Sequence, residues 1–329
     1  MMKQIPKSGI SRRRFIVSAG VVGTMAVLTG SAAATKAVLR PITWTGSALG
    51  AEASIQLYHD DPEWAKQQLN RCQSEIIRLE RLFSLYKPNS AISRLNAQGY
   101  LDDPDIEFLE LMSLAMSFTQ QSDGLFDVTV QPLWKLYVDH FSKGNANPAG
   151  PAHEEITDAL KYVGSQHNHI TPRRIAFQKP GMAATFNGIA QGYITDRVAA
   201  LLRAAGFTNV LVSLGENHAL GGKPDGTPWR VGIVSPKDGS TITTKVDLMN
   251  KALATSGGYG SPFSPNSRAN HLLNPLTGGC AEFERSVTVI SNSATQADMA
   301  STALSMLPTD QGRELASRLP FIDRVIYET

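Results

Sequence analysis

The spacing of apolar residues changes near residue 160, and this change restricts the chain to a mixed architecture. Before it, apolar residues recur at steps of three and four, which predicts an amphipathic helix with one buried stripe: Leu69, Cys72, Ile76, Leu79 and Phe83. After it, short β-like runs alternate with two helical segments. We therefore predict an α+β fold in which mixed or antiparallel sheets are covered by helices.

Local signals place the individual elements. Asp61 followed by Pro62 is typical of a helix start. Ile55 and Leu57 alternate with polar residues and so mark one face of a strand. Further helices are predicted over about 105–119, 188–205 and 294–307, and strands over 51–59, 175–178, 209–213, 229–234, 241–246, 252–255, 287–291 and 324–327.

Composition narrows the class of protein further. The chain has 329 residues, of which 42% are hydrophobic and 18% charged, which excludes disorder, collagen-like repeats and coiled coil. Five basic residues and no acidic one lie in 1–35, and they contribute a charge of +5. Since the whole chain has a net charge of +2, residues 36–329 have a net charge of −3. A slightly acidic body argues against nucleic acid as a partner.

The first 35 residues have the three parts of an export signal. Arg12, Arg13 and Arg14 form a twin-arginine pattern, and the weakly apolar run over 15–28 is too short for a stable membrane span. A small-residue cleavage site follows near Ala34. We predict a signal peptide over 1–35, passage of the folded chain through the twin-arginine export machinery, and a mature domain over 36–329 in the periplasm. The alternative is a basic amphipathic N-terminus or membrane anchor.

The two cysteines, Cys72 and Cys280, lie far apart in the sequence. In an oxidising compartment they could form a disulfide if their Cα atoms came within bridging range. Cys72 also falls on the apolar stripe of the first helix, so a buried thiol is an equally good interpretation. Neither a CxxC motif nor a Cys/His metal spacing occurs.

Two motifs could hold a phosphate and a metal ion. The segment Asn187-Gly188-Ile189-Ala190-Gln191-Gly192 opens a predicted helix, where glycines allow close approach and free N–H groups suit a phosphate. The alternative is a glycine-rich turn before a core helix. Asp298 and Thr302 lie four apart on another predicted helix, and both offer oxygens of the kind that Mg²⁺ prefers. Alternatively, Asp298 is solvated and Thr302 bonds to its own helix.

Three other segments carry candidate side chains. The segment 270–278 reads as a strand running into a turn, and its His271 is either a general acid/base or a structural histidine. The segment 122–129 places an aromatic residue and a carboxylate after a tight turn. Tyr86 follows a helix and could stack on a flat ring. The sequence contains no G-x-S-x-G, HExxH, P-loop or Rossmann fingerprint.

Taken together, the order and spacing of these segments resemble the ApbE family of FAD:protein FMN transferases. The resemblance covers nearly the whole predicted mature chain and implies a two-part body related to the T-fold. It also implies a reaction in which FAD is cleaved, FMN is joined to a Ser or Thr of a target protein, and AMP is released. The matching segments are 49–50, 79–96, 124–133, 188–193, 254–257, 271–278 and 297–304.

The resemblance assigns roles to individual residues. Asp298 and Thr302, with the backbone carbonyl of Gly188, are implied as Mg²⁺ ligands. His271 is implied to assist proton transfer, and Asp298 is counted with it among the catalytic residues. The implied contacts to FAD are Leu49, Tyr86, Leu125, Phe126, Asp127, Gln191 and Thr277.

The chain departs from the family pattern at several of these positions. Gln191 stands where the family usually has a Lys, and Thr185 stands where it usually has an acid. Two short motifs also differ: Leu49-Gly50-Ala51 replaces Met-Gly-Thr, and Gly215-Glu216-Asn217 replaces Gly-Gly-Asp. A lost Lys removes a charge-assisted phosphate contact of about 1.5–3 kcal/mol. The variant helix-start motif and the twin-arginine leader resemble the NosX branch, which is linked to nitrous oxide respiration and implies a NosR-like membrane flavoprotein as the partner.

Two other functions remain open at this point. The protein could carry FAD without chemistry, which Gln191 favours and the Asp298–Thr302 pair opposes. It could also hydrolyse FAD to FMN and AMP, with water replacing the acceptor hydroxyl. The acceptor motif of the family, about Asp-x-x-[Ser/Thr]-Gly-Ala-[Ser/Thr], does not occur, so modification of the chain by itself is not expected.

Overall fold

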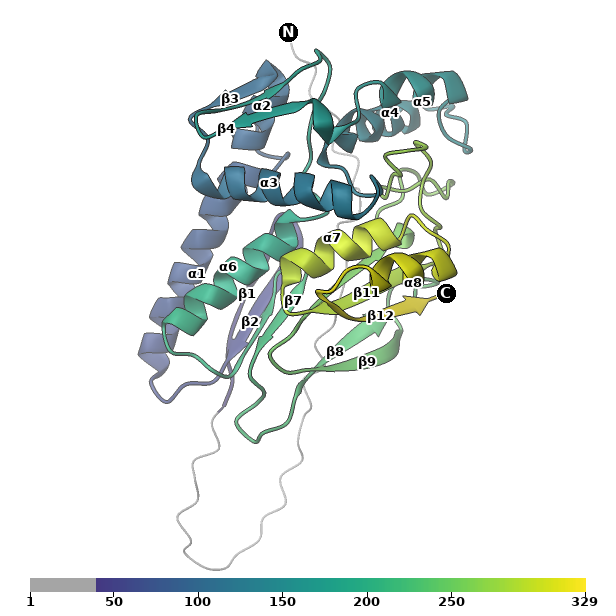
Figure 1. The fold of residues 1–329 in the computed structure, drawn as a ribbon. Helices are drawn as coiled ribbons and strands as arrows, with labels where there is room; N and C mark the ends of the chain where they lie inside the picture. The colour runs from purple at the N-terminus through teal and green to yellow at the C-terminus, as the bar shows by residue number, and fades with distance from the viewer. Residues whose placement is uncertain (1–39) are drawn as a thin grey trace, which may run out of the picture.

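A seven-stranded antiparallel sheet forms the centre of the molecule in the computed structural model, which describes residues 40–329 (Figure 1). The predicted signal peptide and its cleavage site lie outside the described residues. The strand order is β1-β2-β6-β7-β10-β11-β12. The strands are β1 (Ile42–Ala48), β2 (Ala51–Leu57), β6 (Val210–Ser213), β7 (Asn217–Leu220), β10 (Ala252–Gly257), β11 (Ser286–Ser291) and β12 (Ile322–Glu328).

Both faces of this sheet are covered. Helices α6 (Ala190–Ala204) and α7 (Ala294–Leu304) lie side by side on one face (Figure 1). The hairpin of β8 (Trp229–Val234) and β9 (Ile242–Leu248) packs against the other face. Successive side chains of β6 therefore enter different hydrophobic clusters, since those of Val210 and Val212 face the helices and that of Leu211 faces the hairpin.

The remaining elements extend the helical side. Helix α1 (Pro62–Phe83) packs against α6 and β1, and α8 (Thr309–Ser317) packs against β12. Figure 1 shows α3 (Ile106–Gln121) above α6 and α7, with a small sheet of order β3-β5-β4 beyond it and the pair of α4 and α5 to one side. These further elements are α2 (Ala91–Gln98), β3 (Tyr100–Asp102), α4 (Gln131–Phe141), α5 (His153–Leu160), β4 (Asn168–Thr171) and β5 (Arg174–Phe177).

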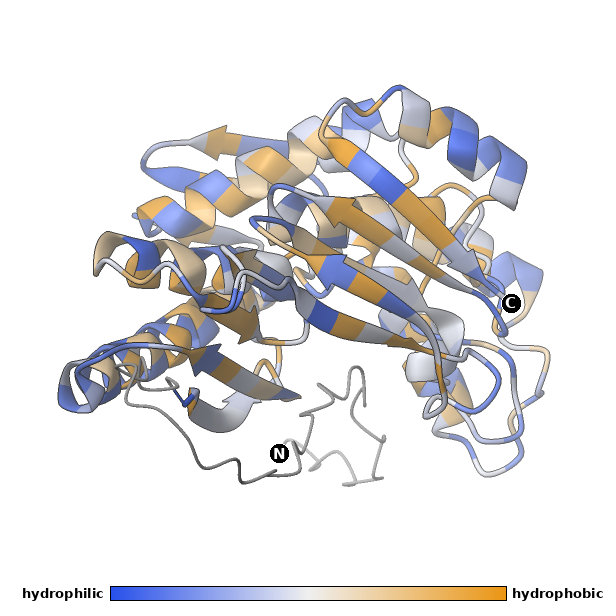
Figure 2. Ribbon diagram, turned by 90° about the horizontal axis from the view of Figure 1, so that it is seen from below, coloured by the Kyte–Doolittle hydropathy of each residue, from blue (hydrophilic) through white to orange (hydrophobic). Residues whose placement is uncertain are grey.

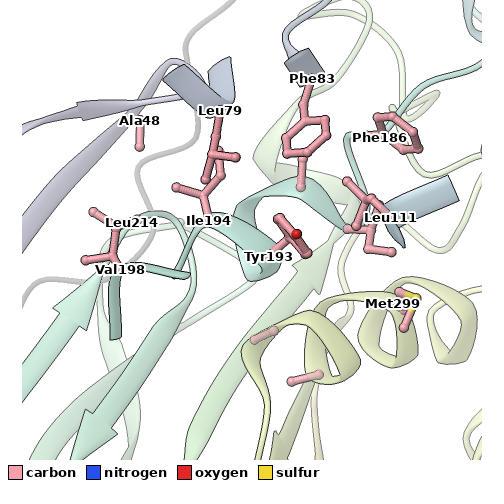
Figure 3. Packing of buried hydrophobic residues seen from close by; sticks show 14 of the residues in the cluster. Ala48, Leu79, Phe83, Leu111, Phe186, Tyr193, Ile194, Val198, Leu214 and Met299 are labelled. Carbon is pink, nitrogen blue, oxygen red and sulfur yellow. The ribbon is translucent and has the colours of Figure 1, made fainter. Parts of the chain in front are cut away.

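Helix α6 lies at the centre of the largest core. Its Ile194 and Val198 are fully buried, and Figure 3 shows Ile194 next to Leu79 of α1 and Val198 next to Leu214. The ring of Phe83 meets that of Tyr193 edge-on, with ring centroids 5.6 Å apart. The position of α6 is thus fixed by packing on several sides.

The structure confirms the α+β prediction and the main features of the first helix. The stripe predicted from its spacing is buried in α1, and an Asp61 carboxylate oxygen accepts hydrogen bonds from the N–H groups of Glu63 and Trp64, both at 3.0 Å. Buried and less buried positions alternate along β2, and Figure 2 shows hydrophobic and hydrophilic residues alternating along the strands. Among the helices of residues 40–329, none has the length and apolar content needed to cross a membrane.

Candidate active site

The start of α6 and the helix α7 approach each other closely because two glycines face α7. A Cβ placed on Gly188 would lie 3.1 Å from the Thr302 hydroxyl oxygen. A Cβ placed on Gly192 would lie only 2.4 Å from the carbonyl oxygen of Ala294. Any side chain at Gly192 would therefore force the two helices apart.

The same contact brings together the three predicted metal ligands. Asp298 and Thr302 lie one turn apart on α7, and Gly188 faces Thr302 across the contact. Asp298 is buried, and one of its carboxylate oxygens accepts a hydrogen bond of 3.0 Å from the N–H of Gly192. The Thr302 hydroxyl lies 3.3 Å from that of Ser256 on β10.

This donor set fits Mg²⁺. A carboxylate, a hydroxyl and a backbone carbonyl are all hard oxygen donors, and the missing side chain at Gly188 leaves room beside Thr302. Within residues 40–329, no group of three or more His, Cys, Asp or Glu side chains is arranged to hold a metal ion. A single carboxylate suits Mg²⁺ that is completed by substrate phosphates and water.

The helix start offers fewer phosphate donors than the sequence suggests. The N–H groups of Ile189 and Ala190 donate to the carbonyl of Phe186 at 3.0 and 2.8 Å, and the N–H of Gly192 donates to Asp298. These amides are therefore engaged within the protein. These three N–H groups are therefore not open to a phosphate.

A pocket opens beside the metal-ligand group. It is formed by the loop before α4, the segment leading into α6, the segment around His271 and the end of α7. Trp134, Asn187 and Pro275 also line it, although none of them was among the predicted site residues. The predicted site residues that line it are Leu125, Phe126, Asp127, Gly188, His271 and Thr302.

Asp127 shapes the wall of this pocket through hydrogen bonds. One carboxylate oxygen accepts from the N–H and hydroxyl of Thr129 at 2.8 and 2.7 Å, and the other accepts from the N–H of Ser165 at 2.8 Å. These bonds fix the loop that carries Leu125 and Phe126. A direct contact of Asp127 with FAD stays a prediction.

The segment around His271 is irregular, so the predicted strand is wrong. Only isolated β-bridges pair Asn270 and Leu273 with other residues. The turn that follows His271 is held by Asn274, whose side-chain oxygen accepts from the N–H groups of Leu276 and Thr277. His271 lines the pocket and Thr277 lies in the turn that follows.

Three other predicted contacts lie outside the residues that line the pocket. Tyr86 is 72% exposed, which leaves its ring open to a ligand or partner. Leu49 lies in the turn between β1 and β2, and its N–H donates to Glu80 at 2.8 Å. Gln191 is buried in the first turn of α6. Their roles as FAD contacts stay predictions.

Gln191 lies against Gly215, the residue directly before the departures at Glu216 and Asn217. Gly215 has a φ of +96°, and a Cβ there would lie 2.4 Å from the Gln191 side-chain nitrogen. The neighbouring Glu216 is buried, and its carboxylate accepts from the N–H of Thr255 at 3.2 Å. The effects of substitutions at Gln191 and Gly215 should therefore not be independent of each other.

Sequence reasoning missed Asp196, which lies on α6 one turn after Gly192. Its carboxylate binds the first residues of α7 through hydrogen bonds from Ser293, Ala294 and Thr295. The signal that could have found it is spacing, because residues 192 and 196 lie four apart on α6 and so share one helix face, with Gly188 four residues before them.

A hard-oxygen donor set beside a pocket that contains a histidine is the class of site used for metal-assisted chemistry on phosphate groups. The chain belongs to the ApbE family, whose model matches residues 49–326. It is similar to the FAD:protein FMN transferase of Escherichia coli K12, with 29% identity over 269 residues that cover 78% of this chain and 76% of the relative. The FAD:protein FMN transferase of Salmonella typhimurium LT2 is 27% identical over an alignment that covers 83% of this chain and 80% of the relative.

Solved structures of the family share the fold. The apo form of the Pseudomonas stutzeri flavinyl transferase ApbE has a TM-score of 0.73 and 29% identity, covering 88% of this chain and 92% of that one. The ApbE protein of Thermotoga maritima has a TM-score of 0.75 and 26% identity, covering 88% and 94%. Both comparisons extend over nearly all of the residues described here.

Proposed function

We propose that this protein transfers FMN from FAD to a Ser or Thr hydroxyl of a periplasmic flavoprotein, with Mg²⁺ required and AMP released. Its family and its relatives define the activity as that of an FAD:protein FMN transferase. The observation that carries the Mg²⁺ requirement is that Gly188 faces Thr302 in the lining of the pocket, with Asp298 one turn before Thr302 on α7.

The residues of the site have separate tasks in this reaction. Asp298, Thr302 and the Gly188 carbonyl would hold Mg²⁺, which when bound neutralises charge on the phosphate oxygens. His271 would take the proton of the acceptor hydroxyl. The acceptor oxygen then bonds to the phosphorus of FMN, the P–O bond to AMP breaks, and AMP leaves with the electron pair.

The location and the partner are further parts of the proposal. The twin-arginine leader supports export of the folded protein to the periplasm. The leader and the variant segment 187–192 together support a NosX-like role, with a NosR-like membrane flavoprotein as the acceptor and nitrous oxide reduction as the process served.

The test is incubation of the mature protein with FAD, Mg²⁺ and the periplasmic domain of a NosR-like protein, followed by intact mass measurement. We expect the acceptor to gain one FMN, with AMP released and EDTA blocking both. An unmodified acceptor with released AMP would indicate an FAD hydrolase. Bound FAD without AMP would indicate a carrier, the alternative that Gln191 in place of a Lys favours. Gln191→Lys would then be the next variant.

A further inference from the structure

We infer that Asp196 is the positioning residue of the metal site, because it fixes the register of α7 against α6 and thereby the place of Asp298 and Thr302. The inference rests on the Mg²⁺ site of the proposed function. Asp196 itself lies on the far side of Gly192 from Gly188 and is not proposed to contact the metal ion.

The carboxylate of Asp196 makes an unusually complete set of hydrogen bonds. One oxygen accepts from the N–H of Ala294 at 2.8 Å and lies 2.7 Å from Nδ1 of His218 on β7. The other accepts from the Ser293 hydroxyl at 2.6 Å and from the N–H and hydroxyl of Thr295 at 2.9 and 2.6 Å. A side chain of α6 thus caps the N-terminus of α7 and is itself held from the sheet.

Asp196 makes one of three successive contacts between α7 and the stretch that runs from Gly188 into α6. Gly188 faces Thr302, Gly192 faces Asp298 and Ala294, and Asp196 holds the first turn of α7. The two segments therefore run antiparallel, with the metal ligands at one end of the contact and Asp196 at the other.

The contact is close at Gly192, where a Cβ would lie 2.4 Å from the carbonyl oxygen of Ala294, and α7 itself is rich in buried alanines. The buried residues of α7 at three-residue steps are Ala294, Ala297, Ala300 and Ala303. Small side chains allow close approach but provide little shape to prevent one helix from sliding along the other, whereas a buried polar contact specifies register. Asp196 supplies such a contact at the N-terminus of α7, in addition to the hydrogen bond from Gly192 to Asp298, and Asp298 follows one turn after the residues that Asp196 holds.

The test compares Mn²⁺ binding, measured by the EPR signal of free Mn²⁺, in the wild-type protein and its variants. We expect Asp196→Ala to weaken Mn²⁺ binding about tenfold. The Mn²⁺ affinity of Asp196→Asn should lie between those of the wild type and Asp196→Ala. Its amide oxygen still accepts from the N–H of Ala294, whereas its NH₂ group cannot accept from the N–H of Thr295. In FMN transfer, the KM for Mg²⁺ should rise more than kcat falls at saturating Mg²⁺.

The control is Leu248→Ala, which creates a cavity in the β8–β9 hairpin on the opposite face of the sheet. This variant should lose stability but bind Mn²⁺ within about twofold of wild type. If Asp196→Ala does not fold, Ser293→Ala, which removes one donor, should still weaken Mn²⁺ binding measurably.

Three outcomes overturn the inference. If Asp196→Ala folds and binds Mn²⁺ with wild-type affinity, Asp196 contributes to stability only. If Asp196→Ala does not fold, wild-type Mn²⁺ affinity in Ser293→Ala leads to the same conclusion. Absence of Mn²⁺ binding in the wild-type protein would remove the metal site and the inference with it. Mn²⁺ binding without FMN transfer would instead contradict the proposed function and leave this inference standing.

Discussion

At the scale of single residues, Asp298 supplies the one carboxylate of the proposed Mg²⁺ site. Its carboxylate is buried on α7 beside small side chains, and a hydrogen bond from Gly192 fixes one of its oxygens. A buried carboxylate is costly unless polar partners or a cation compensate its charge. This environment suits a residue that holds a divalent cation.

We predict that Asp298→Ala removes Mg²⁺-dependent FMN transfer, with a loss of at least about 100-fold, because a neutral methyl group supplies no ligand. FMN transfer and Mn²⁺ binding should be lost together. Unchanged transfer in a variant that binds no Mn²⁺ would show that the assigned metal site is not used.

Gly192 allows a separate test at the residue scale. We predict that Gly192→Ala destabilises the protein by about 1–3 kcal/mol, because the new Cβ would lie 2.4 Å from the carbonyl oxygen of Ala294. The free energy of unfolding in urea measures this. Gly144→Ala is the matched control, since a Cβ on Gly144 meets no atom within 4 Å. Equal stability of both variants would contradict the close contact of α6 and α7.

At the scale of elements, the N-terminus of α7 depends on a charge from α6. Burial alone would raise the pKa of Asp196, but the hydrogen bonds from His218, Ser293 and Thr295 outweigh it and hold this pKa below its ordinary value. Because the folded-state pKa is lowered, Asp196 stabilises the protein fully above its unfolded pKa of about 3.9, and this stabilisation is lost as the pH falls through the folded pKa.

We predict that Asp196→Asn is less stable than wild type by about 1–3 kcal/mol at pH 7 and that the difference shrinks below about pH 4. Urea unfolding between pH 7 and pH 3 measures both proteins. A constant difference across this range would mean that the ionised form of Asp196 does not support α7.

At the scale of the whole molecule, the central sheet is buried on both faces. Both cysteines are free thiols in this fold. Burial raises the pKa of Cys72 to about 12, and burial also raises the pKa of Cys280. Since the thiolate is the reactive form, both thiols should be inert in the folded protein.

We predict that a thiol reagent at pH 8 labels neither cysteine quickly and that labelling of Cys72 follows global unfolding. Mass measurement after labelling in increasing urea should give the same midpoint as the loss of helical signal. Rapid labelling of Cys72 without urea would contradict its burial within α1.

The sequence by itself determined the elements whose signals are local. The apolar stripe of α1 recurs every three or four residues, and its Asp61 cap lies directly before the helix. The residues that specify this helix are therefore its own residues. Helices α2, α4 and α5 were not predicted, because 8 to 11 residues form a marginal helix and packing decides whether it is stable. The irregular segment around His271 likewise depends on partners distant in the sequence.

The candidate site divides in the same way. The spacing of Asp298 and Thr302 and the glycines at 188 and 192 were visible in the sequence, but each signal alone was weak, and their order gained meaning through the family resemblance. Only the tertiary structure decided that Gly188 faces Thr302, that Gln191 meets Gly215, and that Asp196 caps a helix about 100 residues further along the chain. The physical reason is that local spacing determines which side chains share a face, whereas packing determines what that face meets.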